Sequence, residues 1–138
     1  MDFLILIHLI SSVTLTGAVI AGLACVTLCS GYESFARYKF CFFIDSVIFL
    51  MIFADCASGG LLVNAHKLSF HTPWIDAAFL LLSLMSVLVI SSVIIKLKNK
   101  NNYLKAIKVS RVIYFLMLIL IILISRDAFM KSTYLWPN

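Results

Sequence analysis

The chain has 138 residues, of which 63% are hydrophobic and only 12% charged, and its mean hydropathy is +1.10. This composition excludes an ordinary water-soluble domain, in which about 25% of the residues are charged. A helix that crosses a bilayer core of about 30 Å needs roughly 20 apolar residues. Four segments approach that length. We therefore expect an all-α membrane protein in which residues 1–138 form a single up-down-up-down bundle of four transmembrane helices.

The first two predicted helices cover residues 3–29 and 40–64. The first contains no charged residue, and the second is interrupted only by Asp45 and Asp55. The polar segment SGYESFARYK between them is typical of a loop. No basic residue precedes the first apolar run and no small-residue cleavage motif follows it. We therefore expect a retained helix rather than a cleaved signal peptide.

The third predicted helix covers residues 75–95 and follows the polar segment NAHKLSFHTPW. The fourth covers residues 112–130, although its fully apolar part ends near Ile124. That apolar part alone is too short to span a bilayer without tilting. We therefore expect the helix to continue through Arg126 and Asp127, which places both charges near the headgroup layer.

Basic residues are distributed unevenly between the two predicted sides of the membrane. One side holds Arg37, Lys39, Lys96, Lys98, Lys100, Lys105, Lys108 and Arg111, and the other holds Lys67, Arg126 and Lys131. Cytoplasmic loops carry the excess of Lys and Arg, so we expect both termini on the outer side of the membrane, outside the cytoplasm. The net charge of +5 is then explained by topology and contact with anionic lipid, and we expect no nucleic-acid partner.

With this orientation, the polar residues that are unusual for a membrane protein gather toward the outer side. His8 lies near the outer end of the first helix. At its depth the second helix has Gly59 and Gly60, which leave room for a close backbone or a flat ligand. The other polar residues of this outer group are Asp55, His66, His71, Asp76, Arg126 and Asp127.

An ionisable residue inside a membrane helix costs free energy unless it has a partner, so His8 is a candidate functional residue. Three interpretations are open. In the first, His8 holds the helices together by hydrogen-bonding Asp55 or a carbonyl of the second helix. In the second, it ligates a haem iron, with His66, His71 or another chain as the second axial ligand. In the third, the three histidines and an outer carboxylate form a copper or zinc site.

The other carboxylate within the second helix, Asp45, lies near its inner end. Two acids on one helix are compatible with a proton path, but the third helix offers only serines opposite them. We therefore expect Asp45 to pair with a nearby cation, which would be Arg37, Lys39 or Arg111.

Three stretches carry a resemblance to known membrane proteins: IHLISSVTLTG, FFIDSVIFLMIFADCASGGLL and FHTPWIDAAFLLLSL. Their shared features are an early histidine followed nine residues later by glycine, an aspartate in the first turns of the second helix, a Ser-Gly near its end, and a Pro-Trp before the third helix. These features resemble a bacterial family of predicted four-helix integral membrane proteins of unknown function. That family is distantly similar to the membrane protoporphyrinogen oxidases and the copper-resistance D proteins.

The resemblance implies that His8 matches the histidine that is tied to haem in the oxidase relatives. Those enzymes also carry a basic residue soon after the tryptophan that opens the third helix. Here Trp74 is followed by Ile75, Asp76, Ala77 and Ala78, without a lysine. The resemblance therefore implies haem or porphyrin binding rather than oxidase activity.

Two classes of function follow. The first is a small membrane protein that binds a b-type haem through His8 and has a redox or tetrapyrrole-related role, with Arg126 or His71 at the outer edge where the propionates would emerge. The second is a non-catalytic accessory subunit that packs against a larger, respiratory-type membrane complex or against itself.

Overall fold

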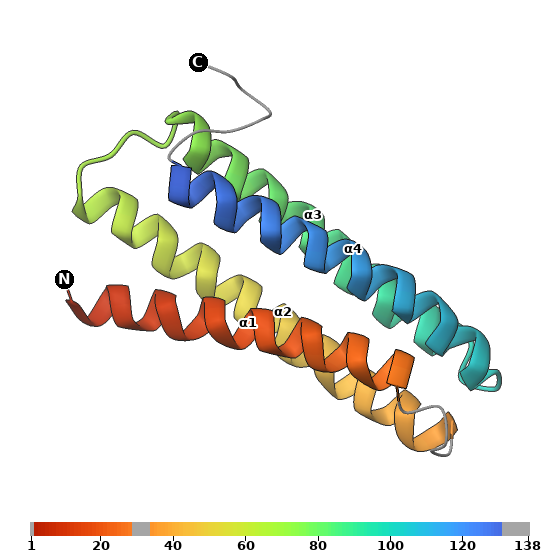
Figure 1. Ribbon diagram of the computed structural model, residues 1–138. Coiled ribbons are helices and arrows are strands. Elements are labelled where there is room, and N and C mark those ends of the chain that lie inside the picture. Colours follow the sequence, from red (N-terminus) through yellow and green to blue (C-terminus); the bar gives the residue numbers. More distant parts are fainter. Residues whose placement is uncertain (1, 29–33, 131–138) are drawn as a thin grey trace.

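The computed structural model describes residues 2–28 and 34–130, and the regular structure in these ranges is helical. Four helices follow one another: α1 (Asp2–Leu28), α2 (Ser34–Ala65), α3 (Pro73–Lys98) and α4 (Tyr103–Met130). They run antiparallel in sequence order (Figure 1), which confirms the expected all-α four-helix bundle. Position 29, the predicted end of the first helix, lies outside the described residues.

Two helices begin earlier than the apolar runs predicted. α2 starts at Ser34 instead of residue 40, and α4 starts at Tyr103 instead of residue 112. The added turns contain Lys, Arg and Tyr, which are compatible with a helix but not with the hydrocarbon core, so apolarity alone placed these boundaries too late. At its other end α4 reaches Met130, which confirms that Arg126 and Asp127 belong to the helix.

α3 extends beyond its prediction at both ends. It begins at Pro73, a residue that suits the first helical position because it has no backbone N–H to leave unpaired. The preceding Thr72 has an extended backbone. At the other end α3 continues to Lys98 and so includes Lys96, which was expected in a loop.

All four helices are long and apolar enough to cross a membrane, with mean hydropathies between 2.1 and 2.7. Only 22 to 33% of the residues in their apolar windows are buried within the bundle. Large side chains such as Phe3, Val13, Phe43 and Phe53 are exposed. Exposing such apolar side chains to lipid costs little free energy, whereas exposing them to water is unfavourable. The chain is therefore a multi-pass membrane protein whose outer faces contact the bilayer.

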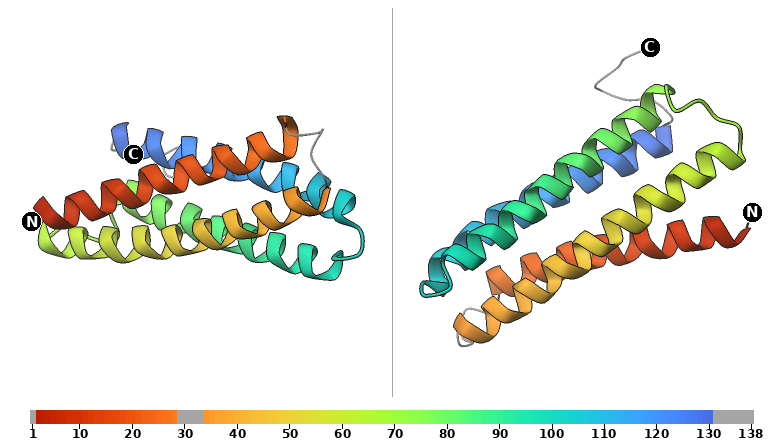
Figure 2. Two further views of the ribbon diagram at one scale, coloured as in Figure 1. Left: turned by 90° about the horizontal axis from the view of Figure 1, so that it is seen from below. Right: turned by 180° about the vertical axis from the view of Figure 1, so that it is seen from behind.

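The helices pack as two pairs, α1 beside α2 and α3 beside α4 (Figures 1 and 2). The pairs meet where α1 packs against α4 and α2 against α3, while α2 and α4 also approach each other across the centre. Side chains that are almost completely buried fill the interface: Val19, Ile48, Met85, Val89 and Met117.

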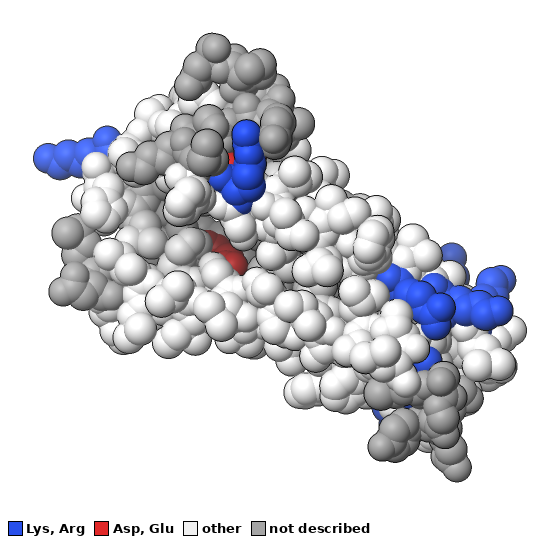
Figure 3. All heavy atoms as spheres, viewed as in Figure 1, with Lys and Arg blue, Asp and Glu red and all other residues white. Residues whose placement is uncertain are grey.

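The two ends of the bundle differ in charge. We call the end where α1 and α3 begin the histidine end, because His8 and His66 lie there, and the opposite end the lysine end. Figure 3 shows the basic side chains clustered toward the lysine end. The exposed basic residues of that end are Lys39, Lys98, Lys100, Lys105, Lys108 and Arg111.

Asp45 pairs with Lys96, so the expected pairing with Arg37, Lys39 or Arg111 is wrong. Nζ of Lys96 donates to Oδ2 of Asp45 at 2.5 Å, and both side chains are essentially fully buried. The hydroxyl of Tyr114 lies 2.7 Å from Oδ1 of Asp45. The prediction failed because Lys96 belongs to α3, where the helix turns its side chain inward.

Arg37 and Arg111 have a different role at the lysine end. Their Nη2 atoms donate to the backbone carbonyl of Val26, at 3.1 Å and 2.8 Å respectively. Val26 lies in the last turn of α1, where unpaired carbonyls and the negative end of the helix dipole attract cations. The two guanidinium groups therefore cap α1 from α2 and α4.

Candidate functional site

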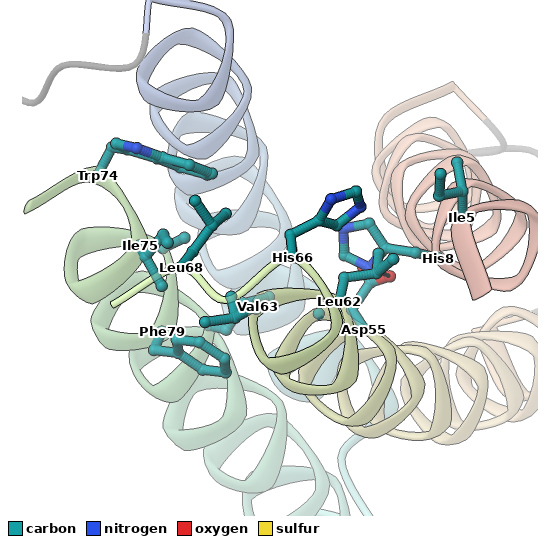
Figure 4. A pocket seen from close by; sticks show the side chains of 13 residues that line it. Ile5, His8, Asp55, Leu62, Val63, His66, Leu68, Trp74, Ile75 and Phe79 are labelled. Carbon is teal, nitrogen blue, oxygen red and sulfur yellow. Dashed lines mark ion pairs between the residues drawn. The ribbon is translucent and has the colours of Figure 1, made fainter. Parts of the chain in front are cut away.

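A cavity of about 290 Å³ lies at the histidine end, between α1, α2 and α3 (Figure 4). We call it the first cavity. It is near the lower limit of the roughly 300 to 1,000 Å³ that is typical of ligand pockets, and its walls are mainly apolar. It is lined by Ile5, His8, Asp55, Gly59, Leu62, Val63, His66, Leu68, Trp74, Ile75, Ala78, Phe79 and Leu82.

The imidazole of His8 reaches from α1 onto α2 at one end of this cavity. Its Nδ1 lies 3.0 Å from the hydroxyl of Ser58 and 3.6 Å from Oδ1 of Asp55. A methyl group added at Gly59 would lie 3.4 Å from Cε1 of the ring. The space at Gly59 is thus taken up by the imidazole itself, which packs closely on the α2 backbone.

The partners of Ser58 assign the tautomer of His8. The Ser58 hydroxyl has one proton, which it donates to the carbonyl of Ala54 at 2.7 Å. When this proton is donated to that carbonyl, the Ser58 oxygen accepts from His8, and Nδ1 of the imidazole then carries the proton. In a neutral imidazole this leaves Nε2 with a free lone pair. Within residues 2–28 and 34–130, no side chain or backbone group hydrogen-bonds to that nitrogen.

Asp55 is buried beside His8 and is held by α1 through one oxygen. Oδ1 accepts hydrogen bonds from the hydroxyls of Ser11 and Ser12, the latter at 3.0 Å. No described residue donates to Oδ2. The side chain is only 5% exposed, so one oxygen of a buried carboxylate lacks a donor among the described residues.

His66 enters the first cavity from the turn that ends α2. Lys67 has a φ of 53°, a left-handed conformation that reverses the chain, and the N–H of Leu68 then donates to the carbonyl of Val63 at 3.0 Å. This is the hydrogen bond of a Schellman cap. The left-handed residue of such a cap, here Lys67, is usually glycine. Figure 4 shows the His66 and His8 imidazoles at the same end of the cavity and Trp74 at the other.

A second cavity of about 230 Å³ adjoins the first between α1, α3 and α4. Five residues line both: His8, Asp55, Trp74, Ala78 and Leu82. The remaining lining residues of the second cavity are Ser12, Leu15, Thr16, Ile121, Ile124, Ser125 and Ala128. His8 and Asp55 therefore stand where the two cavities meet.

The structure brings His8, Asp55, Gly59 and His66 together around the first cavity, but the remaining candidates lie elsewhere. His71 is exposed on the loop before α3, and Asp76 is exposed in the first turn of α3. Gly60 faces Phe79, with 4.0 Å between the ring and an added methyl group. Arg126 donates to Asp127 at 2.9 Å and is not among the residues that line either cavity.

Sequence reasoning gave no role to the hydroxyl of Ser58 and missed Ser11. Ser11 and Ser12 follow His8 by one helical turn, a spacing that would have shown a shared polar face directed at Asp55. Ser58 was noted only as the Ser-Gly of the resemblance, and the role of its hydroxyl is decided only once α1 packs against α2.

The described ranges contain no group of three or more His, Cys, Asp and Glu side chains placed to hold a metal ion. The set expected for copper or zinc is thus not assembled there, since His71 lies apart from His8 and His66. A haem iron needs only one or two axial ligands from the protein, so this finding does not bear on haem.

Comparisons with known proteins add no assignment: no family model, no curated protein and no solved structure matches the chain. The resemblance noted in the sequence stays a prediction.

Proposed function

We propose that this membrane protein binds a b-type haem in the cavities of the histidine end, with Nε2 of His8 as an axial ligand. The observation that carries the proposal is the hydrogen bond from Nδ1 of His8 to Ser58. It orients the ring and leaves the lone pair on Nε2, the form of imidazole that binds a metal. A hydrogen bond on the far nitrogen, with a carboxylate close by, is the usual support of a metal-bound histidine.

The surroundings of His8 are compatible with a flat, mainly apolar ligand. The two cavities adjoin at His8, and their shared wall includes Trp74 and Leu82. His66 lines the first cavity on the same side and would supply a second ligand to the iron. Arg126 follows Ser125, which lines the second cavity, and a propionate could reach it at the membrane surface. A haem bound there would supply one-electron redox chemistry.

Haem titration of the purified full-length protein, followed by absorption spectroscopy, tests the proposal. We expect a Soret band in the parent and none in His8→Ala or His8→Gln, because glutamine can hydrogen-bond but ligates iron poorly. His66→Ala should keep the band but change its position as one axial ligand is lost. His71→Ala is the matched control and should leave the spectrum unchanged.

Stability measurements separate this proposal from a purely structural role for His8. If the residue only joins helices, His8→Gln should behave like the parent and only His8→Ala should lose stability, by about 0.6 to 2 kcal/mol. If the protein shows no haem absorption and His8→Gln is as stable as the parent, haem binding is overturned. That outcome would support the second candidate, a non-catalytic accessory subunit of a larger membrane complex.

The charge of the lysine end supports an orientation with both termini on the periplasmic side of a bacterial inner membrane. Lys67 and Arg126 are the described basic residues at the histidine end, whereas six exposed basic residues lie at the lysine end. Lys131 is outside the described residues. Reporter fusions at Asn102 and Asn138 test this orientation. A cytoplasmic signal from the Asn138 fusion would reverse it.

A further inference from the structure

The polar atoms that α1 and α2 offer to a ligand in the second cavity are hydrogen-bond acceptors. Oδ2 of Asp55 and Nε2 of His8 both carry lone pairs, and no described residue donates to either. The hydroxyl protons nearby are already used: Ser12 donates to Asp55 at 3.0 Å, and Thr16 donates to the carbonyl of Ser12 at 2.9 Å. These walls therefore present hydrogen-bond acceptors without donors.

An unpaired carboxylate oxygen is costly in this position. Asp55 is 5% exposed and lies on a membrane-spanning helix, so water compensates it poorly. No Lys or Arg is among the described residues that line either cavity. Figure 3 shows acidic atoms at the floor of a hollow between the two helix pairs. Asp55 and His8 both line the second cavity, so an occupant can reach them. The occupant that complements them must bring its own donor.

The apolar residues that line the cavities define the rest of that occupant. Leu15, Leu82, Ile121 and Ile124 are aliphatic, and the indole of Trp74 lines both cavities. A mainly apolar cavity of about 230 Å³ favours a neutral ring over a hydrated ammonium group, which would have to be desolvated. A ring that carries hydroxyl groups satisfies both conditions.

We propose that the second cavity binds a lipid-soluble hydroquinone, one hydroxyl of which donates to Oδ2 of Asp55. The ring lies among the aliphatic side chains from α1 and α4 and against Trp74. This site needs no metal, but it shares the second cavity with the proposed haem, so we expect the hydroquinone to bind the haem-free protein and to compete with haem.

Tryptophan fluorescence tests the proposal, because the chain has only two tryptophans and Trp136→Phe leaves Trp74 as the single reporter. The probes are tetramethylhydroquinone and its dimethyl ether, which keeps the ring but lacks the hydroxyl protons. We expect saturable quenching by the hydroquinone and binding of the ether that is weaker by roughly tenfold or more. Equal affinities, or no saturable quenching, would overturn the proposal.

Two further variants locate the ligand. Asp55→Leu removes the acceptor and should weaken hydroquinone binding by roughly tenfold or more, whereas Asp76→Leu removes an exposed carboxylate outside the cavities and should have no effect. Ala128→Phe fills the second cavity without touching Asp55, so it should abolish binding even if Asp55→Leu does not fold. Unchanged affinity in Ala128→Phe, or in folded Asp55→Leu, would refute the site. The Soret band and its loss in His8→Gln decide the haem proposal. Saturable quenching by the hydroquinone in the parent decides this one, so either proposal can fail alone.

Discussion

Lys96 and Asp45 form an ion pair between α3 and α2 that is almost completely shielded from both water and lipid. Nζ of Lys96 also donates to the hydroxyl of Ser92 at 2.9 Å, and Tyr114 contributes a hydroxyl from α4. The pair thus joins three helices at the lysine end. At the histidine end, by contrast, the described polar side-chain contacts between helices join α1 to α2.

Removing one member of this pair should destabilise the fold strongly. Lys96→Met leaves the carboxylate of Asp45 buried without its cation, and we expect a loss of about 3 to 5 kcal/mol in the free energy of unfolding. Denaturation in detergent micelles, followed by circular dichroism, measures it. Lys98→Met is the control, because Lys98 is exposed, and should change stability little. Equal effects of the two variants would contradict a structural role for the pair.

Gly22 is required by the close approach of Tyr114. A methyl group at this position would lie 2.9 Å from the Tyr114 ring and 3.1 Å from Cγ2 of Ile44. The ring cannot easily retreat, since its hydroxyl is bonded to Asp45. We expect Gly22→Ala to cost about 1 to 3 kcal/mol in unfolding experiments.

Gly17 provides the matched comparison on the same helix. No atom lies within 4 Å of a methyl group added there, and alanine favours a helix over glycine by about 1 kcal/mol. Gly17→Ala should therefore be neutral or stabilising. If both glycines tolerate alanine equally, the packing of α1 against α4 differs from that described.

Replacing Lys67 by glycine should stabilise the fold. The left-handed backbone at this position costs a residue with a side chain roughly 1 to 2 kcal/mol. Glycine avoids that cost, but its greater freedom in the unfolded chain offsets part of the gain. We expect Lys67→Gly to stabilise by about 0.5 to 1 kcal/mol in thermal denaturation. Asn64→Gly, which lies within α2, should instead destabilise by a few tenths of a kcal/mol.

Ser58 should govern haem affinity through His8 if the proposed function holds. Ser58→Ala removes the oxygen that accepts from Nδ1, so the ring loses its orientation, and we expect haem affinity to fall by about 10- to 100-fold. Ser46→Ala is the control. Ser46 is on the same helix and bonds only its own helix, at the carbonyl of Phe42. Equal haem affinity in the two variants would remove Ser58 from the site.

The sequence by itself determined the number of helices, because four long apolar runs leave no other way to satisfy the backbone in a bilayer. It also determined that Arg126 and Asp127 belong to the last helix, since the apolar run before them was too short. His8 and Asp55 were recognised as unusual from their type and depth alone.

Only the tertiary structure decided which polar groups meet. Apolar residues surround each helix on nearly all sides, so no periodicity shows which face turns toward a neighbour. The sequence offered Arg37, Lys39 and Arg111 as partners of Asp45, and its actual partner Lys96 was settled by the inward turn of α3. The tautomer of His8 depends in the same way on Ser58, 50 residues away. Such contacts arise from how helices rotate and cross, and a hydrogen bond inside a membrane fixes that rotation because an unpaired polar group has no water to replace its partner.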